Sequence, residues 1–155
     1  MAAQPWAALP FGIGTMEIHK GYLYWINTFM STFYRIPIDS HGYVPANAKS
    51  EKYLALRVAF VDGFTFGPRG GDTIWAVTNA DSRLLAITPD KKVTFLAGSP
   101  DQLTLGGCTM PRFGQRHGDE RTLYIVTYGS LLLPVNGTLT EGGKLVSVDT
   151  TGVLC

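Results

Sequence analysis

The stretch Thr73–Asn79, TIWAVTN, lies in the middle of the chain, and similar stretches stand on either side of it. The other two are Tyr22–Asn27, YLYWIN, and Thr122–Tyr128, TLYIVTY. Each is a run of aromatic and β-branched residues that ends in a polar residue, and the three end residues are 52 and 49 positions apart. A period of about 40–50 residues, with several short strands in each repeat, is typical of a β-propeller.

Each repeat is expected to form one blade, a four-stranded antiparallel sheet. The expected blades span residues 12–56, 57–99 and 106–155. The second has four strand-like segments in order, whereas the third lacks its fourth strand because the chain stops at Cys155. The sequence therefore predicts an all-β fold, in which residues 1–155 form a single partial β-propeller of about three blades.

Composition excludes several partners. The chain has 155 residues, of which 16% are charged, and a net charge of +1, so neither nucleic acid nor an anionic membrane is an expected partner. No apolar run approaches the roughly 20 residues of a membrane helix. Met1–Trp6 lacks the basic and long apolar regions of a signal peptide, which makes the cytoplasm the default location. Cys108 and Cys155 form no metal-binding spacing and no disulfide framework.

Four strings carry a resemblance to a known family. They are Gly21–Tyr24 (GYLY), Thr32–Asp39 (TFYRIPID), Ile87–Asp90 (ITPD) and the longest, Pro134–Lys144 (PVNGTLTEGGK). In them the chain resembles the family of senescence marker protein, gluconolactonase and luciferin-regenerating enzyme, and in particular its fungal branch. The resemblance implies blades of a six-bladed propeller. It runs from Leu9 to Val153 but aligns with only the C-terminal half of a full-length relative.

Three blades do not close a ring by themselves. An open wedge would expose two apolar blade faces and unpaired strand edges, which proteins generally avoid. Three explanations stay open at this point: a shortened gene product, a homodimer in which three plus three blades complete a six-bladed ring, or a truncated gene model.

In a propeller the ligand site lies at one end of the central channel. The loops that enter each inner strand and those that leave each second strand meet there. On this basis the candidate catalytic residues are Asp62, Thr109 and Tyr128, and the candidate substrate-binding residues are Asn27, Phe29, Asn79 and Arg112. For the asparagines and Asp62, the alternative is that they satisfy backbone groups of their own turns. No metal ligand is assigned.

The fungal branch includes natural-product proteins, some of which catalyse hetero-Diels–Alder cyclisation. The resemblance therefore implies a metal-independent enzyme or binding protein of fungal secondary metabolism that acts on an apolar small molecule and needs no cofactor. Such catalysis requires a shaped pocket and a few hydrogen-bond donors. A natural-product cyclase of this kind is the first hypothesis.

Two alternatives remain. The first is a metal-dependent lactonase of the gluconolactonase type, in which Asp62, Asn27 and Asn79 would help to bind Ca²⁺ or Zn²⁺. Many fungal relatives have a double acid where this chain has Asp62 and Gly63, so one carboxylate is missing for this role. The second alternative is a non-catalytic truncated propeller.

Overall fold

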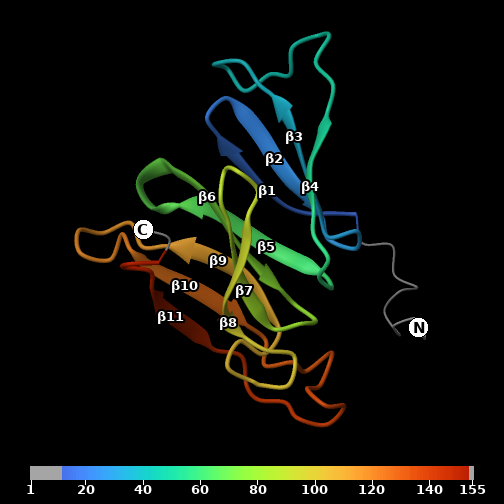
Figure 1. The fold of residues 1–155 in the computed structure, drawn as a ribbon, viewed down its shortest axis with the longest axis vertical. Helices are drawn as coiled ribbons and strands as arrows, with labels where there is room; N and C mark the ends of the chain where they lie inside the picture. The colour runs from blue at the N-terminus through green and yellow to red at the C-terminus, as the bar shows by residue number, and fades with distance from the viewer. Residues whose placement is uncertain (1–11, 154–155) are drawn as a thin grey trace.

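The computed structural model describes residues 12–153, which form three antiparallel sheets and no α-helix (Figure 1). The expectations for Met1–Trp6 and Cys155, and the first residues of the resemblance from Leu9, lie outside the described residues. Each sheet is a meander in which neighbours along the chain are also neighbours in space.

The first two sheets have four strands each. The first contains β1 (Ile13–His19), β2 (Tyr22–Asn27), β3 (Thr32–Pro37) and β4 (Glu51–Ala55). The second contains β5 (Val61–Gly67), β6 (Gly71–Thr78), β7 (Arg83–Ile87) and β8 (Val93–Gly98), with a 3-10 turn at Pro68–Gly70 between β5 and β6. We call these sheets blade 1 and blade 2.

The third sheet, blade 3, has three strands: β9 (Cys108–Phe113), β10 (Thr122–Thr127) and β11 (Leu145–Asp149). The strands β1, β5 and β9 form the inner edges of the blades, and β5 contacts both of the others (Figure 1). The predicted fold class, all-β with four-stranded antiparallel propeller blades, is thus confirmed.

Two apolar clusters hold the blades together. Between blades 1 and 2, the buried rings of Phe33 and Phe64 meet edge to face with centroids 5.2 Å apart. Between blades 2 and 3, Trp75 meets Phe113 in the same way at 5.5 Å. Such pairs add about 0.5–1.5 kcal/mol beyond the area that they bury. Aromatic pairs between neighbouring blades therefore help to fix how the blades stack.

The inner strands begin earlier than predicted. The sequence pattern placed Asp62 and Thr109 in loops before the strands Gly63–Phe66 and Pro111–Phe113, but both residues lie inside β5 and β9. The cause is a β-bulge at each position, where one extra residue interrupts the alternation that marks a strand while the ladder continues beyond it. The candidate residues Asp62 and Thr109 therefore lie in bulges within strands and not in loops.

Candidate functional site

The three inner strands carry a bulge at the same place. In β1 the extra residue falls at Gly14–Thr15, in β5 at Asp62 and in β9 at Thr109, and Thr15, Asp62 and Thr109 are spaced by 47 residues. Bulges redirect side chains and are frequent beside active sites. The repeat therefore brings three equivalent polar residues to one end of the inner strands, and the Thr15 hydroxyl donates to the backbone oxygen of Asp62 at 2.9 Å.

A chain of side-chain hydrogen bonds joins three of the predicted site residues. The amide nitrogen of Asn79 donates to Oδ2 of Asp62 at 2.9 Å, and the Tyr128 hydroxyl donates to Oδ1 of Asn79 at 2.8 Å. Asp62 comes from the bulge of blade 2, Asn79 follows β6 and Tyr128 follows β10. The chain therefore ties the end of blade 2 to the end of blade 3.

Burial sets the protonation of this group. It raises the pKa of the Asp62 carboxyl, which the Asn79 hydrogen bond partly offsets. It also raises the pKa of Tyr128, with a further contribution from the negative charge of Asp62. The neighbouring Cys108 thiol is fully buried and has a pKa raised to about 12, so it is not a nucleophile at neutral pH. Tyr128 and Cys108 are therefore neutral at physiological pH.

Gly63 allows the two inner strands to approach each other beside Asp62. A Cβ at this position would lie 2.2 Å from the backbone oxygen of Thr109 and 3.0 Å from Cα of Met110. An acidic side chain at this position would not fit without moving β9 away from β5. Glycine at position 63 therefore agrees with the tight packing of the two blades at this end.

The other predicted residues lie outside the hydrogen-bonded chain. Oδ1 of Asn27 accepts from the backbone N–H of Met30 at 3.0 Å, so it holds the turn between β2 and β3. Phe29 lies in that turn with 39% of its surface exposed. The Thr109 hydroxyl donates to the backbone oxygen of Val126 at 3.3 Å. For Asn27 the turn role, which was the alternative from sequence, is the one that the geometry supports.

Arg112 belongs to a second polar group that sequence reasoning missed. Its guanidinium lies 2.6 Å from the Glu17 carboxylate and donates to the Thr65 hydroxyl at 3.2 Å. Glu17 also accepts from the backbone N–H of Phe66 at 3.4 Å. Glu17, Thr65 and Arg112 are spaced by 48 and 47 residues. Each comes directly before an apolar residue of its inner strand, namely Ile18, Phe66 and Phe113. That spacing was the available signal.

The described residues do not fit a metal site. Within residues 12–153, no three His, Cys, Asp or Glu side chains lie together as a metal would require. Ca²⁺ takes six to eight oxygen ligands, yet the side-chain oxygens of Asn27 and Asn79 and one oxygen of Asp62 already accept hydrogen bonds from the protein.

Two solved structures have the same arrangement of strands. A luciferin-regenerating enzyme matches 90% of this chain with a TM-score of 0.66 at 15% identity, over 45% of its own length. A calcium-binding protein, regucalcin, from Agrobacterium tumefaciens matches 74% of this chain with a TM-score of 0.55 at 18% identity, over 37% of its length. The chain has the β-propeller fold. The resemblance predicted from sequence is confirmed at the level of the fold.

Two fungal proteins are similar to this propeller chain in sequence. A proposed hetero-Diels-Alderase, asR5, of Sarocladium schorii is 31% identical over 153 residues, or 93% of this chain. A proposed hetero-Diels-Alderase of a Phoma species is 33% identical over 124 residues, or 78% of the chain. This chain spans 38% and 34% of their lengths. No protein-family model matches the chain.

No helix within residues 12–153 is long and apolar enough to cross a membrane.

Proposed function

We propose that these blades form part of the wall of a small-molecule site in a metal-independent enzyme of fungal secondary metabolism, and that the reaction is a hetero-Diels–Alder-type cyclisation of an apolar substrate. The observation that carries the proposal is the similarity, over most of this chain, to two fungal proteins proposed to be hetero-Diels-Alderases. The hydrogen-bonded chain of Asp62, Asn79 and Tyr128 supports it, because it orders a neutral donor, the second amide hydrogen of Asn79, at the bulged end of the inner strands.

For this reaction the protein needs only to position the two reacting partners and to donate hydrogen bonds. A heterodiene and an alkene form one carbon–carbon and one carbon–heteroatom σ bond at the expense of π bonds, so no group leaves and no oxidant is consumed. A site accelerates this step by holding the partners in contact and by donating a hydrogen bond to the heteroatom as its electron density rises. Burial favours this, since donors act more strongly in a water-excluded site.

We assign these roles to the site residues. The second amide hydrogen of Asn79 donates to the heteroatom of the substrate. The Tyr128 hydroxyl, which donates its one hydrogen to Oδ1 of Asn79, holds that amide in place, and the Thr109 hydroxyl, which donates to the backbone oxygen of Val126, lines the site. Asp62 orients Asn79 through the bond at 2.9 Å. Phe29 contacts the apolar part of the substrate from a turn that Asn27 holds in place. Arg112, paired with Glu17, gives a polar wall below the site.

We propose further that a second copy covers the open faces of the wedge. The outer face of blade 1 exposes apolar side chains of β1, with Ile13, Met16 and Ile18 being 62%, 58% and 63% exposed. A hollow of about 230 Å³ on this face is lined only by apolar residues, Trp25 among them. The outer face of blade 3 exposes Leu145. Pairing the blade 1 face of one copy with the blade 3 face of the other would bury both.

The test is stereochemical. The chain is incubated with chalcone, an apolar enone that serves as heterodiene, and ethyl vinyl ether, and the dihydropyran product is analysed by chiral chromatography. The uncatalysed reaction gives a racemate, whereas a chiral site gives an enantiomeric excess. We expect an excess with the wild-type chain, a smaller one with Tyr128→Phe, and no change with Tyr43→Phe, a matched variant at a residue that is 72% exposed. A racemate formed at the uncatalysed rate would overturn the proposal.

A further inference from the structure

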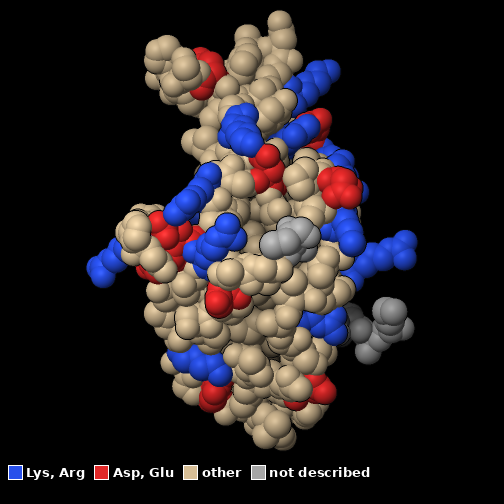
Figure 2. All heavy atoms as spheres, turned by 60° about the vertical axis from the view of Figure 1, so that its left-hand side comes forward, with Lys and Arg blue, Asp and Glu red and all other residues tan. Residues whose placement is uncertain are grey.

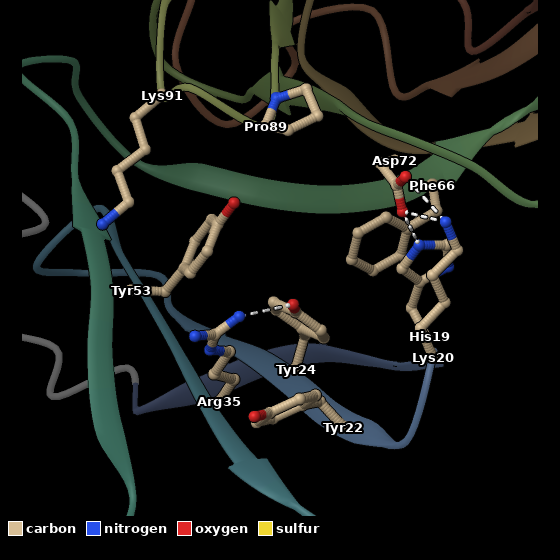
Figure 3. A pocket seen from close by; sticks show the side chains of 10 residues that line it. All are labelled: His19, Lys20, Tyr22, Tyr24, Arg35, Tyr53, Phe66, Asp72, Pro89 and Lys91. Atoms are coloured by element: carbon tan, nitrogen blue, oxygen red, sulfur yellow. Dashed lines mark hydrogen bonds and ion pairs between the residues drawn. The ribbon is translucent and has the colours of Figure 1, made fainter.

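A second cleft lies at the end of the blades opposite the bulges. It is about 400 Å³ in volume and opens between blade 1 and blade 2 (Figure 3). Blade 1 lines it with the β1–β2 turn and with side chains of β2, β3 and β4, and blade 2 lines it with Phe66 of β5, Asp72 of β6 and the β7–β8 turn. The candidate site is formed by the alternate set of turns, so the cleft is separate from it.

Tyrosine rings form one side of the cleft around a guanidinium. Cζ of Arg35 lies 4.5 Å from the ring centroid of Tyr22, 5.9 Å from that of Tyr24 and 5.1 Å from that of Tyr53. The guanidinium donates to the Tyr24 hydroxyl at 3.2 Å and pairs with Glu51. These contacts hold the guanidinium plane in place beside the rings, and 28% of the Arg35 side chain remains exposed (Figure 3).

The charges that line the cleft are mainly positive. Lys20, Arg35 and Lys91 contribute cations, and Asp72 is the one carboxylate among the described lining residues. Asp72 is already paired with Lys20 and with His19, whose ring stacks on Phe66 at 3.8 Å. Nζ of Lys91 lies 5.1 Å from the Tyr53 ring centroid, and no carboxylate within residues 12–153 pairs with it.

Basic side chains also lie on the surface of the molecule around the cleft. Figure 2 shows the side of the molecule that lies on the left in Figure 1, with many Lys and Arg side chains over its middle and some Asp and Glu between them. The cations that line the cleft attract an anion, and the attraction weakens as salt is added.

We propose that this cleft binds a small planar organic anion, an aromatic carboxylate, independently of the proposed cyclisation site. The aromatic ring packs against the tyrosine rings, and the carboxylate lies against the Lys91 ammonium at the rim. A flat ring matches the flat lining, and a single negative charge offsets the cation that has no carboxylate partner. The volume of about 400 Å³ is ample for a one- or two-ring acid.

The test uses 2-naphthoate as the probe in isothermal titration calorimetry at low ionic strength. We expect 2-naphthoate to bind, and the neutral 2-naphthamide, of the same shape, to bind at least about tenfold more weakly. Lys91→Glu should weaken 2-naphthoate binding by about tenfold or more. Lys92→Glu makes the same charge change on the next residue, which does not line the cleft, and should alter the affinity by less than about twofold.

Three results would overturn the proposal. They are equal affinities for the acid and the amide, equal losses in the two lysine variants, and no detectable binding of 2-naphthoate by the wild-type chain. Thermal unfolding of both variants checks that the fold is kept, and both positions are exposed in the β7–β8 turn. If Lys91→Glu does not fold, Tyr53→Leu, which removes a ring from the cleft, must weaken binding of the acid and the amide together.

Discussion

At the scale of single residues, the polar chain of Asp62, Asn79 and Tyr128 is the feature that joins sequence and site. Asn79 is the middle member, and its amide uses its two ends differently: the nitrogen donates to Asp62 and the oxygen accepts from Tyr128. This directionality fixes the amide orientation and so aims its second hydrogen. The hydrogen bonds of Asn79 therefore determine which of its amide hydrogens a substrate would meet.

Asp62→Asn tests the burial of the carboxyl. Burial raises its pKa, so the folded chain holds this proton more tightly than the unfolded chain does. As pH rises through the ordinary carboxyl pKa toward the raised one, the wild-type free energy of unfolding falls, whereas asparagine does not titrate. Urea unfolding should therefore show Asp62→Asn gaining stability relative to wild type between about pH 3 and pH 7. A stability difference that does not depend on pH would contradict this.

Tyr128→Phe tests the bond between blades 2 and 3. The variant keeps the ring and removes the hydroxyl that donates to Asn79, and it should lower the free energy of unfolding by about 0.5–1.5 kcal/mol. Urea unfolding followed by tryptophan fluorescence measures the loss. Tyr43→Phe serves as the control and should leave stability unchanged. Equal stabilities of Tyr128→Phe and wild type would show that the hydroxyl does not hold the blades.

The sequence predicted part of this site for a physical reason. Asn79 and Tyr128 end the second strands of their repeats and Asp62 starts an inner strand, so the fold alone places them at one end of the channel. Their hydrogen bonds could not be predicted, because side-chain orientation at a bulge depends on the ladder on both sides. The ion pair of Arg112 with Glu17 was missed because the two residues are 95 positions apart and belong to blades that are not consecutive.

At the scale of elements, the repeated bulge is the feature that positions the candidate residues. An extra residue in each inner strand turns its side chain out of the sheet alternation, and the repeat does this three times with a spacing of 47 residues. Sequence patterns predicted β2 at its observed bounds, Tyr22–Asn27, since its aromatic and β-branched residues run without interruption up to Asn27. The predicted inner strands are shorter than the observed ones, because a bulge breaks the alternation on which a strand prediction depends.

Gly63→Ala tests the close approach of β5 and β9. Its Cβ would lie 2.2 Å from the backbone oxygen of Thr109, so the strands must separate, and the expected loss of stability is about 1–3 kcal/mol. Gly142→Ala is the matched control, because a Cβ there meets nothing within 4 Å. Thermal unfolding compares the two variants. A Gly63→Ala chain as stable as Gly142→Ala would mean that the inner strands are not packed as described.

At the scale of the whole molecule, the main feature is that the outer faces of blade 1 and blade 3 expose apolar side chains. Figure 1 shows blade 1 at one end of the row and blade 3 at the other, with blade 2 covered on both sides. The apolar residues of blade 1 that face away from blade 2 are the same kind that fill the clusters between blades. The sequence predicted the number of blades. It did not predict what packs against the outer faces of blade 1 and blade 3, because the pattern of strands does not specify which surfaces pack together.

Ile18→Asp tests the proposed pairing of two copies. Ile18 is 63% exposed on the outer face of blade 1, so a charge there costs little in an isolated chain but would be buried in a pair. Sedimentation velocity should give the mass of two copies for wild type and of one copy for Ile18→Asp. Lys49→Asp, a charge change on the exposed β3–β4 connection, should stay paired. A single-copy mass for wild type at every concentration would contradict the pairing.

The central claim is that the bulged end of the inner strands binds an apolar small molecule through Asp62, Asn79 and Tyr128. The most direct test is a titration of the ¹⁵N-labelled chain with chalcone, followed by NMR of backbone and side-chain amides. The account predicts that the Asn79 amide signals shift while those of Asn136, on an exposed turn, do not, and that Tyr128→Phe weakens the binding. Shifts confined to the cleft around Tyr53 and Lys91, or no shift at the solubility limit of chalcone, would contradict it.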